Sequence, residues 1–249
     1  MSRARELAEV DIVRASSRPF SLGTRPVIRW IKGDGRDDEV TRSAIAQATR
    51  IFGDRVDYCM CSAGISAARA RAILAWSDQP VEWWPLGPED NPQLSNVLMA
   101  AGCPSDAFGY WWKWFPERVR PAAPEWILDG DMVITEKPSW FEEWCAGTDR
   151  LRLAREDDAS WDNKQLYGDE YCDFIAPGKR LYSGLVSLAP NLSYLPYILE
   201  VLAIKPLAYG HDGRVNLSEQ GIIACAFGAL NAEPIPLPNF RLAGLLKKS

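Results

Sequence analysis

The stretch Trp126-Ile127-Leu128-Asp129-Gly130-Asp131-Met132-Val133-Ile134 decides the fold, because one apolar run precedes a pair of aspartates and a second apolar run follows it. Two carboxylates at positions i and i+2 point to the same side of an extended segment. At the end of a strand, Asp129 and Asp131 can converge on one divalent cation. Carboxylate oxygens suit Mg²⁺ or Mn²⁺, which also bind the phosphate oxygens of a nucleotide. Gly130 leaves room for a ligand to approach the backbone. The alternative interpretation is a strand that ends in a solvated Asp-Gly turn.

Strand and helix patterns alternate on the N-terminal side of this stretch. Such alternation is typical of a parallel α/β sheet with helices on both faces. Ligands of such sheets bind beyond the carboxyl ends of the strands, which is where the aspartate pair falls. The predicted strands are 26–32, 56–61, 81–86 and 125–128, and the predicted helices are 38–52, 66–76 and 107–115.

The C-terminal half continues the α/β pattern around a polar insert. Ser139 and Glu142 have the spacing of a capping box, so a helix is expected to begin there. Residues 149–179 are charged and irregular, as in segments that cover a site. No linker divides the chain, so we expect a loosely ordered extension at 1–24 and one domain at 25–249. Further predicted elements are a strand at 181–188, helices at 194–203 and from 216 onward, and an extended segment at 234–238.

The composition is that of a globular protein with a sizeable core. Hydrophobic residues make up 47% and charged residues 24%. The net charge of −5 argues against a nucleic-acid partner, because phosphate backbones select basic surfaces. The six cysteines form no CxxC pair, which favours free thiols in a cytoplasmic protein, and peripheral membrane association stays open. The eleven tryptophans are expected to pack in the core more often than to stack on sugars or bases.

The order of these elements resembles that of nucleotide-sugar glycosyltransferases of the GT-A fold, of the galactosyltransferase- and glycogenin-like type. Members of that family have an aromatic and basic helix, a strand ending in DxD, a capped helix, a strand with Asn-Ser-Gly, and a helix opening with Asp-Gln. The resemblance spans roughly residues 27–239 and implies a mixed, mostly parallel Rossmann-like sheet flanked by helices. The matching stretches are Tyr110-Trp111-Trp112-Lys113, Asp129-Gly130-Asp131, Tyr182-Ser183-Gly184, Glu219-Gln220-Gly221 and Leu237-Pro238-Asn239.

The resemblance implies a role for each matched residue. Asp129 and Asp131 would hold Mn²⁺ or Mg²⁺ against the diphosphate of a nucleoside-diphosphate sugar. Lys113 would contact this donor, and the Ser183-Gly184 pair would line its sugar pocket. The Glu219-Gln220 pair would lie beside the sugar that is transferred to a carbohydrate, lipid or protein hydroxyl. A metal in that position acts as a Lewis acid on the leaving diphosphate.

Three departures from the family pattern weaken the case for catalysis. Tyr182 replaces the usual Asn, and Gly221 replaces a carboxylate. The relatives take a third metal ligand from a C-terminal His-x-x-Gly-x-x-Lys segment, whereas the only histidine here, His211, precedes Glu219. The second hypothesis is therefore a nucleotide-sugar-binding or scaffold protein that has lost catalysis.

Several residues have a structural interpretation beside the functional one. Lys113 could be a solvated lysine beside tryptophans. Glu219 could cap its helix together with Asn216, and Asp34 could belong to a plain Gly-Asp-Gly turn. His211 could be a surface histidine. The sequence does not assign the donor base, the sugar, the acceptor, the stereochemistry or the oligomeric state.

Overall fold

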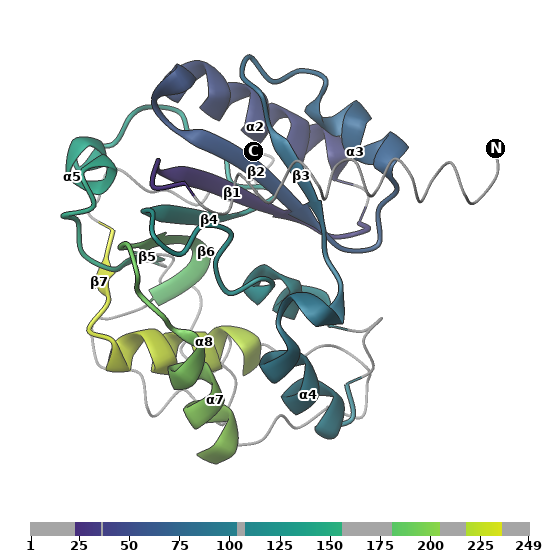
Figure 1. Ribbon diagram of the computed structural model, residues 1–249, viewed down its shortest axis with the longest axis vertical. Coiled ribbons are helices and arrows are strands. Elements are labelled where there is room, and N and C mark those ends of the chain that lie inside the picture. Colours follow the sequence, from purple (N-terminus) through teal and green to yellow (C-terminus); the bar gives the residue numbers. More distant parts are fainter. Residues whose placement is uncertain (1–22, 36, 104–107, 156–180, 205–217, 236–249) are drawn as a thin grey trace, which may run out of the picture.

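The computed structural model describes residues 23–35, 37–103, 108–155, 181–204 and 218–235 (Figure 1). Most of the predicted extension at 1–24, most of the insert at 149–179, and His211 lie outside these described residues. Within the described part of the chain, no helix is long and apolar enough to cross a membrane.

The described residues form a seven-stranded sheet in the order β3-β2-β1-β4-β6-β5-β7. The first four strands along the chain run parallel, and β6 pairs antiparallel with both β4 and β5. This is the mixed, mostly parallel sheet that the sequence predicts. The strands are β1 Val27–Lys32, β2 Asp57–Ser62, β3 Glu82–Pro85, β4 Glu125–Asp129, β5 Arg152–Arg155, β6 Leu181–Leu188 and β7 Glu233–Pro234.

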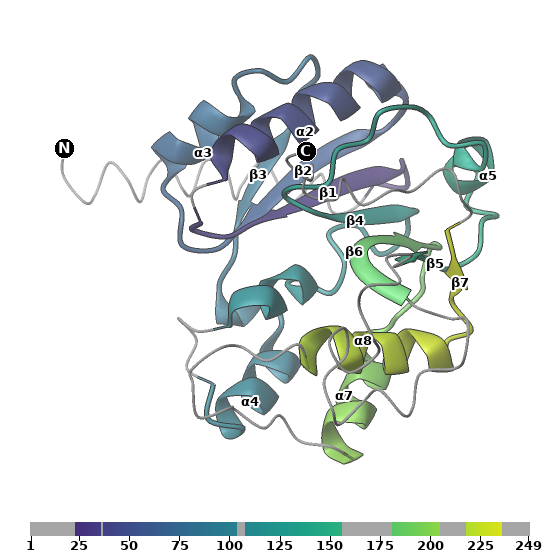
Figure 2. The same cartoon turned by 180° about the vertical axis from the view of Figure 1, so that it is seen from behind.

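Helices cover both faces of the sheet, and Figures 1 and 2 show α2 and α3 on one side and α4, α7 and α8 on the other. The α-helices are α2 Asp38–Phe52, α3 Ala67–Leu74, α4 Pro92–Ala100, α5 Phe141–Cys145, α7 Leu195–Ile204 and α8 Ser218–Ala229. The 3₁₀ helices are η1 Gly53–Arg55, η2 Pro88–Asp90 and η4 Gly109–Trp114.

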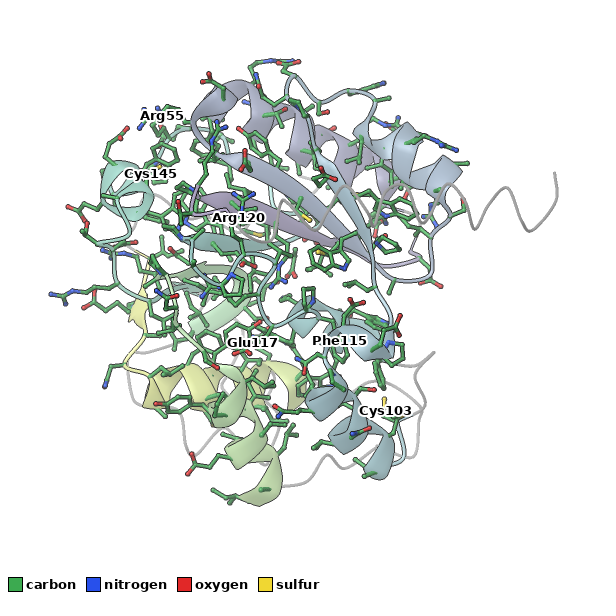
Figure 3. The ribbon with its side chains drawn as sticks, viewed as in Figure 1. Arg55, Cys103, Phe115, Glu117, Arg120 and Cys145 are labelled. Atoms are coloured by element: carbon green, nitrogen blue, oxygen red, sulfur yellow. The ribbon has the colours of Figure 1, made fainter. Side chains whose placement is uncertain are left out.

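Two apolar layers hold the helices to the sheet. Alternate residues of β1 point to opposite faces, so Ile28 and Trp30 pack under α2, while Ile127 of β4 packs toward α7 and α8. The tryptophans at 111, 114, 126, 140 and 144 are all buried, which confirms that most of the aromatic clusters are core. The segment after η4 joins the two layers, and Figure 3 shows Phe115 and Glu117 near the helical layer and Arg120 near the sheet.

Some predicted elements were wrong in type or in detail. The helix predicted at 107–115 is the 3₁₀ helix η4, while α4 was not predicted. The capping box at Ser139 is not formed: α5 has Trp140 at its N-cap position without a side-chain cap, and Glu142 pairs with Arg55 instead. Strand β5 lies inside the span that was interpreted as an irregular insert.

Candidate active site

Asp129 is the last residue of β4 and pairs in register with Ile31 of β1, so it lies at the carboxyl edge of the central parallel strands. A turn follows at once, closed by a hydrogen bond from the Met132 N–H to the Asp129 carbonyl at 3.0 Å. The Asp129 side chain is 26% exposed, and Asp131, inside the turn, is exposed. The aspartate pair therefore spans the strand end and the turn, rather than one extended segment as the sequence predicted.

Gly130 fits this edge because it has no side chain. A Cβ atom at this position would lie 2.8 Å from the Ile31 carbonyl oxygen and 3.0 Å from Thr41 Oγ1. The first contact is with backbone and Thr41 is buried, so neither neighbour can retreat cheaply. The sequence predicted that a ligand approaches the backbone at Gly130, and the neighbours on the Cβ side of this residue are β1 and α2.

Lys113 is buried, and its ammonium contacts Asp129. Its Nζ lies 2.5 Å from Asp129 Oδ1 and donates to Ser183 O and Ser183 Oγ, both at 3.1 Å. These three protein oxygens match the three N–H donors of a lysine. Burial, which lowers the pKa of Lys113, is outweighed by the carboxylates of Asp129 and Glu219, which raise it. The interpretation of Lys113 as a solvated lysine is therefore wrong.

Glu219 lies in the first turn of α8, and its side chain is only 5% exposed. The indole Nε1 of Trp114 donates to Glu219 Oε1 at 2.7 Å, across 105 residues of sequence. Burial raises the pKa of Glu219, and the charge of Lys113 and the hydrogen bond from Trp114 oppose that shift. The adjacent Gln220 is half-buried. Asn216, the predicted capping partner of Glu219, lies outside the described residues.

The two residues predicted to line a sugar pocket have different surroundings. Ser183 is buried and accepts the hydrogen bond from Lys113. A Cβ atom at Gly184 would lie 2.3 Å from the ring of Tyr182, so this ring occupies the space that a side chain at Gly184 would need.

The site is thus built from four separate elements, namely η4, β4, β6 and α8. Sequence reasoning missed Trp114 and Thr41. Trp114 could not be distinguished from its aromatic neighbours, and nothing in the pattern of α2 indicated that Thr41 packs near Gly130. Asp34 follows β1 as predicted and is exposed, and Arg69 donates to its carbonyl at 2.9 Å.

The donor set fits a hard divalent cation. Lys113 contacts one of the two carboxylate oxygens of Asp129, and Asp131 is exposed beside it. Oxygen ligands of this kind suit Mg²⁺ and Mn²⁺, which usually keep waters and substrate phosphates in their remaining positions. The described residues contain no group of three or more His, Cys, Asp or Glu side chains that could hold a metal, so the protein's share would be these two carboxylates.

The comparisons with known proteins bear on the fold. No family model matches the sequence. No curated protein matches it either.

Solved structures do match. The galactosyltransferase LgtC, solved with donor and acceptor sugar analogs, is similar with a TM-score of 0.53 at 15% identity, over 81% of this chain and 70% of LgtC. Mouse xyloside xylosyltransferase 1 aligns with a TM-score of 0.46 at 17% identity, over 83% of this chain and 82% of that protein. The chain therefore has the fold of LgtC, the GT-A fold that its sequence predicts.

Proposed function

We propose that the protein is a glycosyltransferase that moves a sugar from a nucleoside-diphosphate sugar to a hydroxyl group of an acceptor. The observation that carries the proposal is the convergence of Lys113 and Asp129 at the carboxyl edge of β4, in a sheet that has the fold of a galactosyltransferase. Open α/β sheets bind their ligands at this edge. The acceptor would be a carbohydrate, a lipid or a protein hydroxyl, and the free thiols of the described cysteines support a reducing, cytoplasmic compartment.

In this proposal Asp129 and Asp131 hold Mn²⁺ or Mg²⁺ against the donor diphosphate. The bound cation would supply Lewis-acid stabilisation of the leaving diphosphate. Lys113, which also donates to Ser183, keeps the Asp129 carboxylate in one orientation. The carboxylate therefore does not have to reorient when the donor binds. Gln220, at the N-terminal turn of α8, is the proposed neighbour of the transferred sugar.

Two observations favour the second candidate, a protein that binds nucleotide sugars without transferring them. The described residues supply only two carboxylates for the cation, and Glu219 is buried, with its Oε1 bonded to Trp114. Slow turnover of any donor, including hydrolysis to free sugar, would rule out this candidate.

Calorimetry with UDP- and GDP-sugars in the presence of Mn²⁺ tests the proposal. We expect heat of binding for the wild type and its loss in Asp131→Ala. The matched control is Asp54→Ala, an exposed aspartate in η1, which should bind like the wild type. Undiminished binding in Asp131→Ala would remove this residue from the cation site.

A further inference from the structure

Glu219 is a carboxylate whose burial needs an explanation. Glu219 is 5% exposed, and its carboxylate accepts a hydrogen bond from a neutral indole, that of Trp114. Burying a carboxylate costs several kcal/mol, on the order of the penalties known for buried ions. A glutamine would accept the same hydrogen bond through the same oxygen without that cost. A carboxylate at this position therefore calls for an opposite charge nearby.

The positive charge that opposes the effect of burial on Glu219 is that of Lys113. Its ammonium lies 5.9 Å from the centre of the Trp114 ring, and the Nε1 of the same ring is bonded to Glu219. Glu219 follows Asp129 among the carboxylates that raise the pKa of Lys113. Lys113 thus contacts a carboxylate of β4 and lies one indole ring away from a carboxylate of α8.

The charge balance changes what Asp129 can bind. A lysine paired with Asp129 alone would form a closed, neutral pair, which attracts a cation weakly. With Glu219 present, the three carboxylates of Asp129, Asp131 and Glu219 stand against one ammonium, which leaves a formal charge of −2. That charge matches a divalent cation, and a partly buried site has a lower effective dielectric constant than water, so each charge counts for more.

We propose that Glu219 is a positioning residue that balances the charge of Lys113, so that the site formed by Asp129 and Asp131 keeps a net negative charge that holds a divalent cation. Glu219 acts through Lys113 and does not touch the reacting atoms. The inference rests on the proposed function, because it requires a cation at Asp129 and Asp131.

The test is titration of the full chain with Mn²⁺ alone, in which the free Mn²⁺ is read by electron paramagnetic resonance. Glu219→Gln keeps the size of the side chain and the acceptor for Trp114, and lowers the formal charge of the site to −1. We expect its Mn²⁺ affinity to fall about tenfold, because the site loses one of the negative charges that attract the cation. The melting temperature should stay equal or rise, since a buried charge is removed. Glu142→Gln, a surface carboxylate paired with Arg55, is the control and should bind Mn²⁺ like the wild type.

A second substitution separates charge balance from a structural role. Adding Lys113→Met to Glu219→Gln restores the formal charge of −2, so Mn²⁺ affinity should recover toward that of the wild type. If Glu219 and Lys113 had only a structural role, the second substitution would damage the site further and weaken Mn²⁺ binding. If the methionine variant does not fold, Lys113→Gln serves in its place.

The outcomes distinguish the two proposals. Wild-type affinity in Glu219→Gln, or no recovery in the folded double variant, overturns the role of Glu219 and leaves the proposed function intact. Absence of Mn²⁺ binding by the wild type overturns both.

Discussion

At the scale of single residues, Gly130 is a position at which a side chain has no room. The Ile31 carbonyl and Thr41 Oγ1 occupy the space that a Cβ atom would need. Because Gly130 has no side chain, the end of β4 can pack closely against β1 and α2. Any side chain there has to displace the aspartate pair or the end of β1.

Gly130→Ala is expected to lower the free energy of unfolding by about 1–3 kcal/mol, the usual cost of overpacking, and to weaken Mn²⁺ binding. Urea denaturation and Mn²⁺ titration measure the two effects. The control is Gly228→Ala in α8, where an added Cβ meets nothing within 4 Å. That change should stabilise the protein slightly, because alanine suits a helix better than glycine. Equal behaviour of the two variants would contradict the packing argument.

The sequence predicted the position of Asp129 well, because an apolar run that ends in aspartate indicates the edge of a buried strand. It did not predict that Lys113 contacts this carboxylate. Lys113 and Asp129 come from η4 and β4, and sequence spacing carries no information on how two such elements pack. Glu219 had two competing interpretations, and neither of them predicted the hydrogen bond from Trp114.

At the scale of elements, two contacts hold helices in place. Glu117 lies between η4 and β4, and its Oε1 accepts from Ser193 Oγ at 2.6 Å and from the backbone N–H groups of Tyr194 and Leu195 at 3.0 Å. Because the first N–H groups of a helix lack intrahelical partners, this carboxylate acts as a cap for α7 from a distant segment.

Glu117→Ala should cost about 1–2 kcal/mol of stability, as for the loss of a helix cap with a charged acceptor. Chemical denaturation followed by circular dichroism measures the change. Glu200→Ala removes an exposed carboxylate farther along the same helix and should change stability by less than about 0.5 kcal/mol. A loss of similar size at both positions would argue against capping by Glu117.

The turn between β1 and α2 depends on Asp38 and Arg69. Arg69 donates to both carboxylate oxygens of Asp38, at 2.7 and 2.8 Å, which ties α3 to the first turn of α2. The hydrogen bond from Arg69 holds the pKa of Asp38 below its usual 3.8. A carboxyl group whose pKa is lowered by folding stabilises the protein above its unfolded pKa and loses that contribution as the pH falls through its folded value.

Asp38→Asn should therefore destabilise the protein by about 1–2 kcal/mol at pH 7. The difference from the wild type should shrink as the pH falls below about 4, where the wild-type carboxylate gains a proton. Urea denaturation over a range of pH follows this trend. Asp78→Asn breaks the exposed pair with Arg50 and should show little effect at any pH. A pH-independent loss in Asp38→Asn would show that the charge is not what matters.

At the scale of the whole molecule, a buried ion network joins the sheet to the segment that follows η4. Glu125 at the start of β4 pairs with Arg29 of β1 at 3.0 Å and with Arg118 at 3.1 Å. Arg29 and Arg118 also donate to backbone carbonyls, including Pro116 O and Ala189 O. These contacts connect two central strands to the loops of the helical layer.

Glu125→Gln should cost about 3–5 kcal/mol, because it leaves buried arginine charge without its carboxylate. Thermal and urea denaturation measure the loss. Glu82→Gln is the matched control on β3: burial raises the pKa of Glu82, so removing its charge should be neutral or slightly stabilising. A small effect in Glu125→Gln would mean that water reaches the network.

The alternation of strands and helices from β1 to β4 was predictable from the sequence, because their patterns follow one another with short connections, whereas the order of the strands in the sheet was not. The elements that were missed have physical reasons. Helix α4 begins at Pro92, directly after its N-cap residue Asn91, and its apolar pattern is short, so the sequence around its start resembles a loop. Strand β5 is four residues long and lies beside charged sequence, so its pairing with β6, and not its own residues, defines it.

The contact between Trp114 and Glu219 has a consequence for synthesis of the chain. The ribosome releases η4, β4 and β6 before α8, so the parallel strands can assemble while Glu219 is still absent. Until α8 docks, Lys113 has the counter-charges of Asp129 and Asp131 but not that of Glu219, and by the balance proposed above the nascent chain would attract cations more weakly than the folded protein. Competence to bind metal would then arrive in a single late step, once the chain has closed a loop of 105 residues.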